Sequence, residues 1–73
     1  MDYNFYVKLG EALRTERNLH HYTMEQIADY IGVNKSTVMR WEHGKTEMSA
    51  KSLIMYLEFM HVTVADFARR YNI

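Results

Sequence analysis

The 73-residue sequence contains no cysteine and no proline, only three glycines, and no long run of apolar residues. Without cysteine the chain cannot form disulfides or thiolate metal sites, so its stability has to come from packing, as suits a reducing cytoplasm. Without roughly 20 consecutive apolar residues it cannot cross a bilayer as a helix, and its start does not resemble a secretion signal. Because so short a domain buries only about 60% of its unfolded surface, we expect one domain over residues 1–73 with one small core.

The chain also has no excess of either charge, since nine Lys or Arg balance nine Asp or Glu. A formal net charge of zero disfavours a protein that binds polyanions without selectivity. The charges are unevenly distributed, however. Residues 33–51 carry four Lys or Arg against two Glu, whereas residues 1–32 are net acidic. The positive excess therefore falls on one short segment in the middle of the chain.

The residues that are abundant favour helices. Leu, Met, Glu, Lys and Arg are frequent, and dipeptides typical of β-hairpins are missing, so an all-α fold is predicted. Apolar residues at helical spacing, such as Phe5, Leu9, Ala12 and Leu13, place Glu16 and Arg17 on the buried face of the first helix. We expect a compact five-helix bundle, with helices over residues 4–19, 24–31, 35–43, 50–60 and 64–71.

Polar residues mark where these helices begin. Thr23 and Gln26 form a capping box, and Asn34, Ser49 and Thr63 are expected to cap the later helices. Gly32 and Gly44 are predicted to end the second and third helices, and all three glycines are assigned to caps or chain bends. The residues expected to be buried after the first helix are Ile27, Ala28, Ile31, Val33, Val38, Trp41, Glu42, Leu53, Ile54 or Tyr56, Leu57, Met60, Val64, Phe67 and Ala68.

The segment ADYIGVNKSTVMRWEHG, residues 28–44, joins two short helices through a turn of about three residues. Such helices approach closely, so the first needs a small residue at the contact and the turn needs one that tolerates positive φ. Ala28 and Gly32 meet these needs. Apolar contact between the two helices is expected from Ile27, Ile31, Val33, Val38 and Trp41. The pattern predicts a helix-turn-helix over about residues 23–43, with residues 35–41, from Lys35 to Trp41, as its recognition helix.

The outward face of that helix carries side chains suited to the edges of base pairs. We define the reading face as Lys35, Ser36, Met39 and Arg40, with Thr37 beside them. Arg can donate two hydrogen bonds to guanine, Lys can reach guanine or phosphate, Ser pairs with several edges and Met contacts the thymine methyl. His43 and Lys45, just after the helix, are placed for backbone phosphate. The expected partner is therefore double-stranded DNA.

From about residue 9 to residue 68 the sequence resembles the Cro and phage-repressor type of helix-turn-helix domain, also called the XRE family. The matching residues are Leu13, Arg17, Thr23, Ile27, Ala28, Gly32, Val33, Ser36 or Thr37, Val38, Glu42, Gly44, Leu53, Leu57, Val62, Thr63 and Phe67. The resemblance implies a five-helix DNA-binding domain and a partly buried structural ion pair between Arg17 and Glu42. It also implies groove contacts by Lys35, Ser36 and Arg40, and phosphate contacts by Thr37, His43 and Lys45.

The chain departs from the family pattern at two positions. Met24 stands where the family usually has a glutamine that binds phosphate, which puts that contact in doubt. Met48 stands where the family often has a proline before the fourth helix.

A narrower likeness lies in RWEHGKTEMSAKSLIMYLEFMHVTVADF, residues 40–67. This segment is similar to the amino-terminal domain of the Rgg-type regulators of Gram-positive bacteria, whose carboxy-terminal domain binds peptides and forms dimers. A freestanding phage-type regulator would look much the same, so a following C-terminal regulatory domain is left open. Both readings predict a cytoplasmic protein, bacterial or phage-encoded. A homodimer on a two-fold operator is expected, because so short a reading face specifies only a few base pairs.

Two alternatives of other classes remain. A protein-interaction module, antitoxin-like or coactivator-like, would use the apolar surface of the last two helices, where more large residues occur than a small core absorbs. These residues are Met55, Tyr56, Phe59, Met60 and Tyr71, of which one or two are expected to be exposed at a dimer or interdomain surface. A metal or catalytic site at the four histidines is disfavoured because they are scattered and His20 and His21, being adjacent, point differently. No metal, cofactor or enzymatic activity is expected.

Overall fold

The computed structural model describes residues 3–73, and within that range all regular structure is helical. The helices are α1 (Tyr3–Leu19), α2 (Met24–Ile31), α3 (Lys35–Glu42), α4 (Ala50–Phe59) and α5 (Val64–Tyr71). The all-α, five-helix prediction is confirmed, and each predicted boundary lies within one residue of the observed one. None of these helices has the length and apolar character that a bilayer crossing requires.

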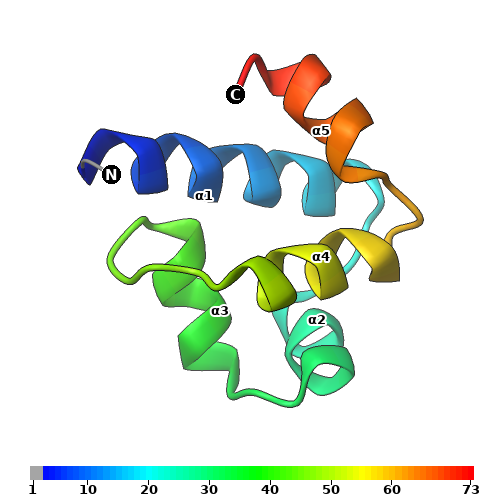
Figure 1. The fold of residues 1–73 in the computed structure, drawn as a ribbon. Coiled ribbons are helices and arrows are strands. Elements are labelled where there is room, and N and C mark those ends of the chain that lie inside the picture. The colour runs from blue at the N-terminus through cyan, green and yellow to red at the C-terminus, as the bar shows by residue number, and fades with distance from the viewer. Residues whose placement is uncertain (1–2) are drawn as a thin grey trace.

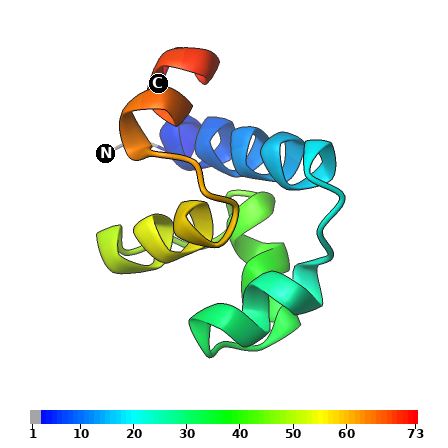
Figure 2. The same ribbon diagram turned by 90° about the vertical axis from the view of Figure 1, so that its right-hand side faces the viewer.

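The five helices are arranged so that α2 and α3 lie at one end of the molecule and α5 at the other (Figures 1 and 2). Between these ends run α1 and α4, with α1 nearer to α5. α3 packs against both α1 and α2, and α4 packs against α2. The helix-turn-helix formed by α2 and α3 is therefore supported on one side by α1 and α4. Its other side is not covered by the rest of the described chain.

The core lies where the first four helices meet, and Phe67 of α5 completes it. Its buried apolar residues are Leu9, Ala12, Leu13, Ile27, Ala28, Val38, Trp41, Tyr56, Leu57, Met60 and Phe67. Four predicted core residues are only half-buried against this cluster, namely Phe5, Ile31, Val33 and Leu53, and Ala68 of α5 is half-buried as well.

The structure corrects one of the sequence-based core predictions and decides between the two residues that another had left open. Burial of Val64 was wrong, since this first residue of α5 is 44% exposed and the helix turns Phe67 inward instead. Of the pair Ile54 or Tyr56, Tyr56 is buried and Ile54 is 51% exposed. None of the large residues suspected of forming an exposed surface is exposed, since Tyr56 and Met60 are buried and Met55, Phe59 and Tyr71 are half-buried.

The helix starts largely follow the predicted capping. Thr23 accepts from the Gln26 amide while Gln26 Oε1 accepts from the Thr23 amide, and Ser49 and Thr63 accept from amides in the first turns of α4 and α5. Asn34 takes the cap position of α3 with extended backbone, but its side chain makes no capping hydrogen bond. The turn between α1 and α2 and the turn between α4 and α5 have a common feature. His21 in the first and His61 in the second both adopt left-handed φ, 61° and 59°.

One glycine was assigned wrongly. Gly32 and Gly44 do have positive φ at the ends of α2 and α3, but Gly10 lies inside α1 at neither a cap nor a bend. It is buried where α1 crosses the end of α3, and an added Cβ would lie 2.4 Å from the carbonyl oxygen of Trp41. Gly10 is therefore required because two backbones touch there.

A buried carboxylate ties α5 to α1. Glu16 has a fully buried side chain and accepts hydrogen bonds from Arg70 Nη1 at 2.6 and 2.7 Å and from the Tyr71 hydroxyl at 2.8 Å. His20 Nε2 lies 3.0 Å from the same carboxylate. Helical spacing placed Glu16 on the buried face, but nothing in the sequence paired it with residues more than 50 positions away.

This cluster gives the fold a pH dependence. Burial alone would raise the pKa of Glu16, but hydrogen bonds from Arg70, Tyr71 and His20 outweigh it and hold the pKa below the ordinary 4.5. A carboxyl whose pKa is lowered by folding stabilises the folded state above its unfolded pKa, and this contribution is lost as pH falls through the folded pKa. We expect Glu16→Gln to lower the melting temperature at pH 7, with the difference from wild type shrinking below about pH 4.5.

Thermal melts between pH 7 and pH 3 measure this difference. Glu11→Gln is the matched control, because Glu11 is an exposed carboxylate on the same helix and should show a small, flat difference. A Glu16→Gln curve that stays parallel to wild type down to pH 3 would contradict the assignment.

Candidate nucleic-acid interface

The two helices of the motif meet at a small residue. Ala28 of α2 is buried, and its carbonyl oxygen accepts hydrogen bonds from the amides of Gly32 and Val33 at 2.8 and 3.0 Å. Gly32 takes φ of 88°, which turns the chain sharply, and α3 begins three residues later. Ile27 and Val38 are fully buried between the helices. The geometry is that of a helix-turn-helix, in which α3 occupies the position of the recognition helix.

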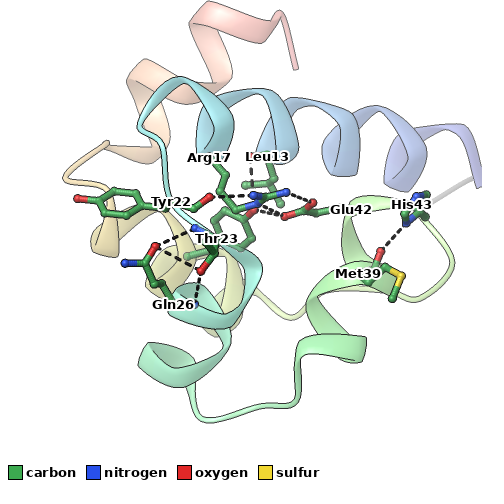
Figure 3. Close-up of polar contacts among 9 residues, drawn as sticks. Leu13, Arg17, Tyr22, Thr23, Gln26, Met39, Glu42 and His43 are labelled. Atoms are coloured by element: carbon green, nitrogen blue, oxygen red, sulfur yellow. Dashed lines mark hydrogen bonds and ion pairs between the residues drawn. The ribbon is translucent and has the colours of Figure 1, made fainter.

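The carboxyl end of α3 is fixed by a buried polar cluster (Figure 3). Arg17 donates from Nε and Nη2 to the two oxygens of Glu42, at 2.8 and 2.9 Å, and from Nη1 to the Tyr22 carbonyl at 2.8 Å. The Tyr56 hydroxyl donates to Glu42 Oε2 at 2.5 Å. The side chains of Arg17 and Glu42 are only 9% and 2% exposed. One carboxylate thus connects α3 to α1, to α4 and, through Arg17, to the turn before α2.

The environment of this cluster shifts the pKa values of Tyr56 and Arg17 upward. Burial raises the pKa of Tyr56, and its hydrogen bond to Glu42 raises that pKa further, so the hydroxyl remains a donor. The hydrogen bonds to Glu42 raise the pKa of Arg17 despite its burial. The family resemblance named Arg17 and Glu42, but sequence reasoning missed Tyr56 as their partner. The available signal was that a buried tyrosine needs an acceptor for its hydroxyl.

The reading face lies on the outer side of α3. Lys35, Ser36 and Arg40 are exposed and Met39 is 40% exposed, while Thr37 is half-buried. Arg40 Nη2 donates to Thr37 Oγ1 at 3.1 Å, which restrains the long arginine side chain. Lys35 Nζ lies 3.4 Å from Oε2 of Glu25 on α2, a neighbour that sequence reasoning did not identify. The predicted groove residues therefore share one accessible surface with Glu25 beside them.

Two of the three residues predicted to contact phosphate, His43 and Lys45, lie at and just after the end of α3. His43 is exposed, and its Nδ1 donates to the Met39 carbonyl oxygen at 2.8 Å, which fixes the ring against the helix (Figure 3). Lys45 is exposed in the following turn, and its amide donates to the Arg40 carbonyl oxygen at 2.9 Å. Within residues 3–73, no three His, Cys, Asp or Glu side chains are grouped as metal ligands would be.

A helix-turn-helix whose second helix exposes Lys and Arg while its far end is anchored in the core defines a class of DNA-binding domain. The family comparison agrees with this class. A family model described as helix-turn-helix matches residues 13–67, and the chain belongs to that family, of the XRE type.

Two relatives extend the comparison. The chain is 31% identical over 58 residues to a protein of Methanocaldococcus jannaschii named as an uncharacterized HTH-type transcriptional regulator, MJ0272, covering 80% of this chain and 88% of that protein. It is also similar to the crystal structure of the clp gene regulator ClgR from C. glutamicum, with a TM-score of 0.84 and 25% identity, covering 92% of this chain and 86% of that one. The fold and the family identify a DNA-binding transcriptional regulator.

Proposed function

We propose that α3 enters the major groove of an operator and that the reading face contacts base edges there. The observation that carries this proposal is the exposed Lys35 and Arg40 on a helix whose other face and carboxyl end are fixed in the core. A rigid helix with exposed cationic and polar side chains can be presented to base edges without first being ordered.

The residues have separate roles in this proposal. Arg40 donates to guanine, Lys35 reaches guanine or phosphate, Ser36 pairs with a base edge and Met39 contacts a thymine methyl. Thr37, His43 and Lys45 contact backbone phosphate, which sets the position of the helix without reading sequence. Arg17 and Glu42 make no DNA contact and hold α3 in place.

Arg40→Ala tests the reading role. We expect a loss of about 1–3 kcal/mol in binding the preferred sequence, with relaxed preference at one base position. The preferred sequence is obtained by selection from a random duplex library with the wild-type chain, and both proteins are then titrated against single-base variants of it. Arg69→Ala is the matched control, because Arg69 is an exposed arginine of α5 at the far end of the molecule. Equal losses on every sequence would assign Arg40 to phosphate instead.

We further propose that residues 1–73 act as one domain and bind DNA as a homodimer. A reading face of four residues specifies few base pairs, and two copies on a two-fold operator double that number. The same titration gives the stoichiometry, and one chain per selected duplex would exclude the dimer. The Rgg-type likeness and a C-terminal regulatory domain stay predictions, because neither relative carries such a name.

Two other apolar residues, one on α4 and one on α5, support the interaction-module alternative. Ile54 and Val64 are exposed and line a shallow groove with Glu58, His61 and Thr63. Salt dependence separates the two functions, because phosphate contacts release counterions and apolar contacts do not.

A further inference from the structure

Glu25 is the feature of the interface that the proposed function does not use. It lies in the first turn of α2, and its carboxylate is within 3.4 Å of Lys35 Nζ on the first turn of α3. Both side chains remain accessible, at 61% and 51% exposed. In the part of the chain that the structure describes, it is the one carboxylate in ion-pair contact with a cation of the reading face. Glu42, the acid within α3 itself, is buried and bound to Arg17.

A negative charge at this position is unfavourable for binding DNA in general. In a helix-turn-helix the first helix crosses the phosphate backbone while the second lies in the groove, so Glu25 faces an anionic partner. The chain nevertheless keeps this group ionised. Its own backbone amide and the neighbouring ammonium group of Lys35 both lower the pKa of Glu25.

We propose that Glu25 is a specificity-determining residue, which holds Lys35 toward the groove and weakens binding to DNA that lacks the operator sequence. The inference rests on the proposed function, because it assumes that Lys35 meets DNA.

Two effects follow from the ion pair. On random DNA, attraction comes from cations that displace counterions from phosphate, and a lysine already paired with a carboxylate contributes less to that displacement. On the operator, Lys35 meets a base edge, and the pairing that restrains its flexible stem reduces the entropy lost on binding. Glu25 therefore weakens random binding more than operator binding, which raises the ratio between the two affinities.

Glu25→Gln tests the proposal, because glutamine keeps the size of the side chain and removes its charge. On a random-sequence duplex at about 0.1 M salt we expect roughly five- to tenfold tighter binding, with the slope of log K against log salt steeper by about 0.9. On the duplex selected with the wild-type chain we expect less than about a twofold change. The ratio of operator to random affinity should therefore fall by several-fold.

Two controls decide how Glu25 acts. Asp29→Asn removes an exposed carboxylate of the same helix that makes no ion pair with the reading face, and should leave both affinities nearly unchanged. In the Lys35→Met background, Glu25→Gln should tighten random binding much less than in the wild-type background, because only direct repulsion from phosphate is relieved and the cation that Glu25 neutralises is absent.

Each outcome bears on one proposal or the other. Equal gains on random and selected DNA, or an equally large gain in the Lys35→Met background, would overturn the role of Glu25 and show that direct repulsion from phosphate accounts for its whole effect. Equal affinity of Glu25→Gln and the wild-type chain for random DNA would also overturn the role of Glu25. Absence of salt-dependent binding by the wild-type chain would remove the proposed function itself, and this inference with it.

Discussion

Glu42→Ala is expected to destabilise the fold by about 3–5 kcal/mol, because it leaves a buried charge without its partner. Arg17 would lose the acceptors of Nε and Nη2 and keep only the Tyr22 carbonyl oxygen. The Tyr56 hydroxyl would lose its 2.5 Å acceptor and keep only a 3.4 Å contact to the Leu13 carbonyl oxygen. A domain of this size has a free energy of unfolding of only about 5–15 kcal/mol. A large fraction of the Glu42→Ala molecules would therefore be unfolded near physiological temperature.

Denaturant unfolding followed by circular dichroism measures this loss. Glu47→Ala is the matched control, since Glu47 is an exposed glutamate in the turn after α3 and should change stability by no more than about 0.5 kcal/mol. The triple variant Arg17→Met, Glu42→Leu and Tyr56→Phe should recover much of the lost stability, because no buried charge or hydroxyl is left unpaired. Equal stability of Glu42→Ala and wild type would show that the cluster does not anchor α3.

Gly10→Ala is expected to destabilise the fold by about 3 kcal/mol, at the upper end for an overpacked core. The added Cβ would lie 2.4 Å from the Trp41 carbonyl oxygen and 2.6 Å from that of Glu42. Both obstacles are backbone atoms, so no side-chain rotation relieves the contact, and α1 and α3 have to separate. The sign of this stability change is informative, because alanine inside a helix is otherwise more favourable than glycine by about 0.5–1 kcal/mol.

Thr15→Ala separates the two effects. Thr15 is an exposed residue of the same helix, where helix propensity alone should make alanine neutral or slightly stabilising. Since α3 would shift against α1, Gly10→Ala should also weaken binding to the selected duplex at temperatures where the variant is still folded. A Gly10→Ala chain as stable as wild type would mean that the two backbones do not touch in solution.

The features that sequence predicted well are those with local causes. The capping box of Thr23 and Gln26, the caps at Ser49 and Thr63, and the helical spacing of apolar residues depend on neighbours within one turn, so the helix boundaries could be predicted closely. The exposure of Lys35 and Arg40 follows from the same periodicity, since Val38 and Trp41 occupy the opposite face.

What the sequence by itself determined is therefore the number of helices, their limits and the outward face of α3, because hydrogen bonds and side-chain periodicity within a helix are local. Only the tertiary structure decided which distant residues meet. Gly10 against Trp41, Tyr56 on Glu42, Arg70 on Glu16 and Glu25 beside Lys35 all depend on how the helices pack. The sequence pattern shows that a residue is buried or that its side chain is polar. Its contact partner depends on which helices cross there, and those helices come together only when the chain folds.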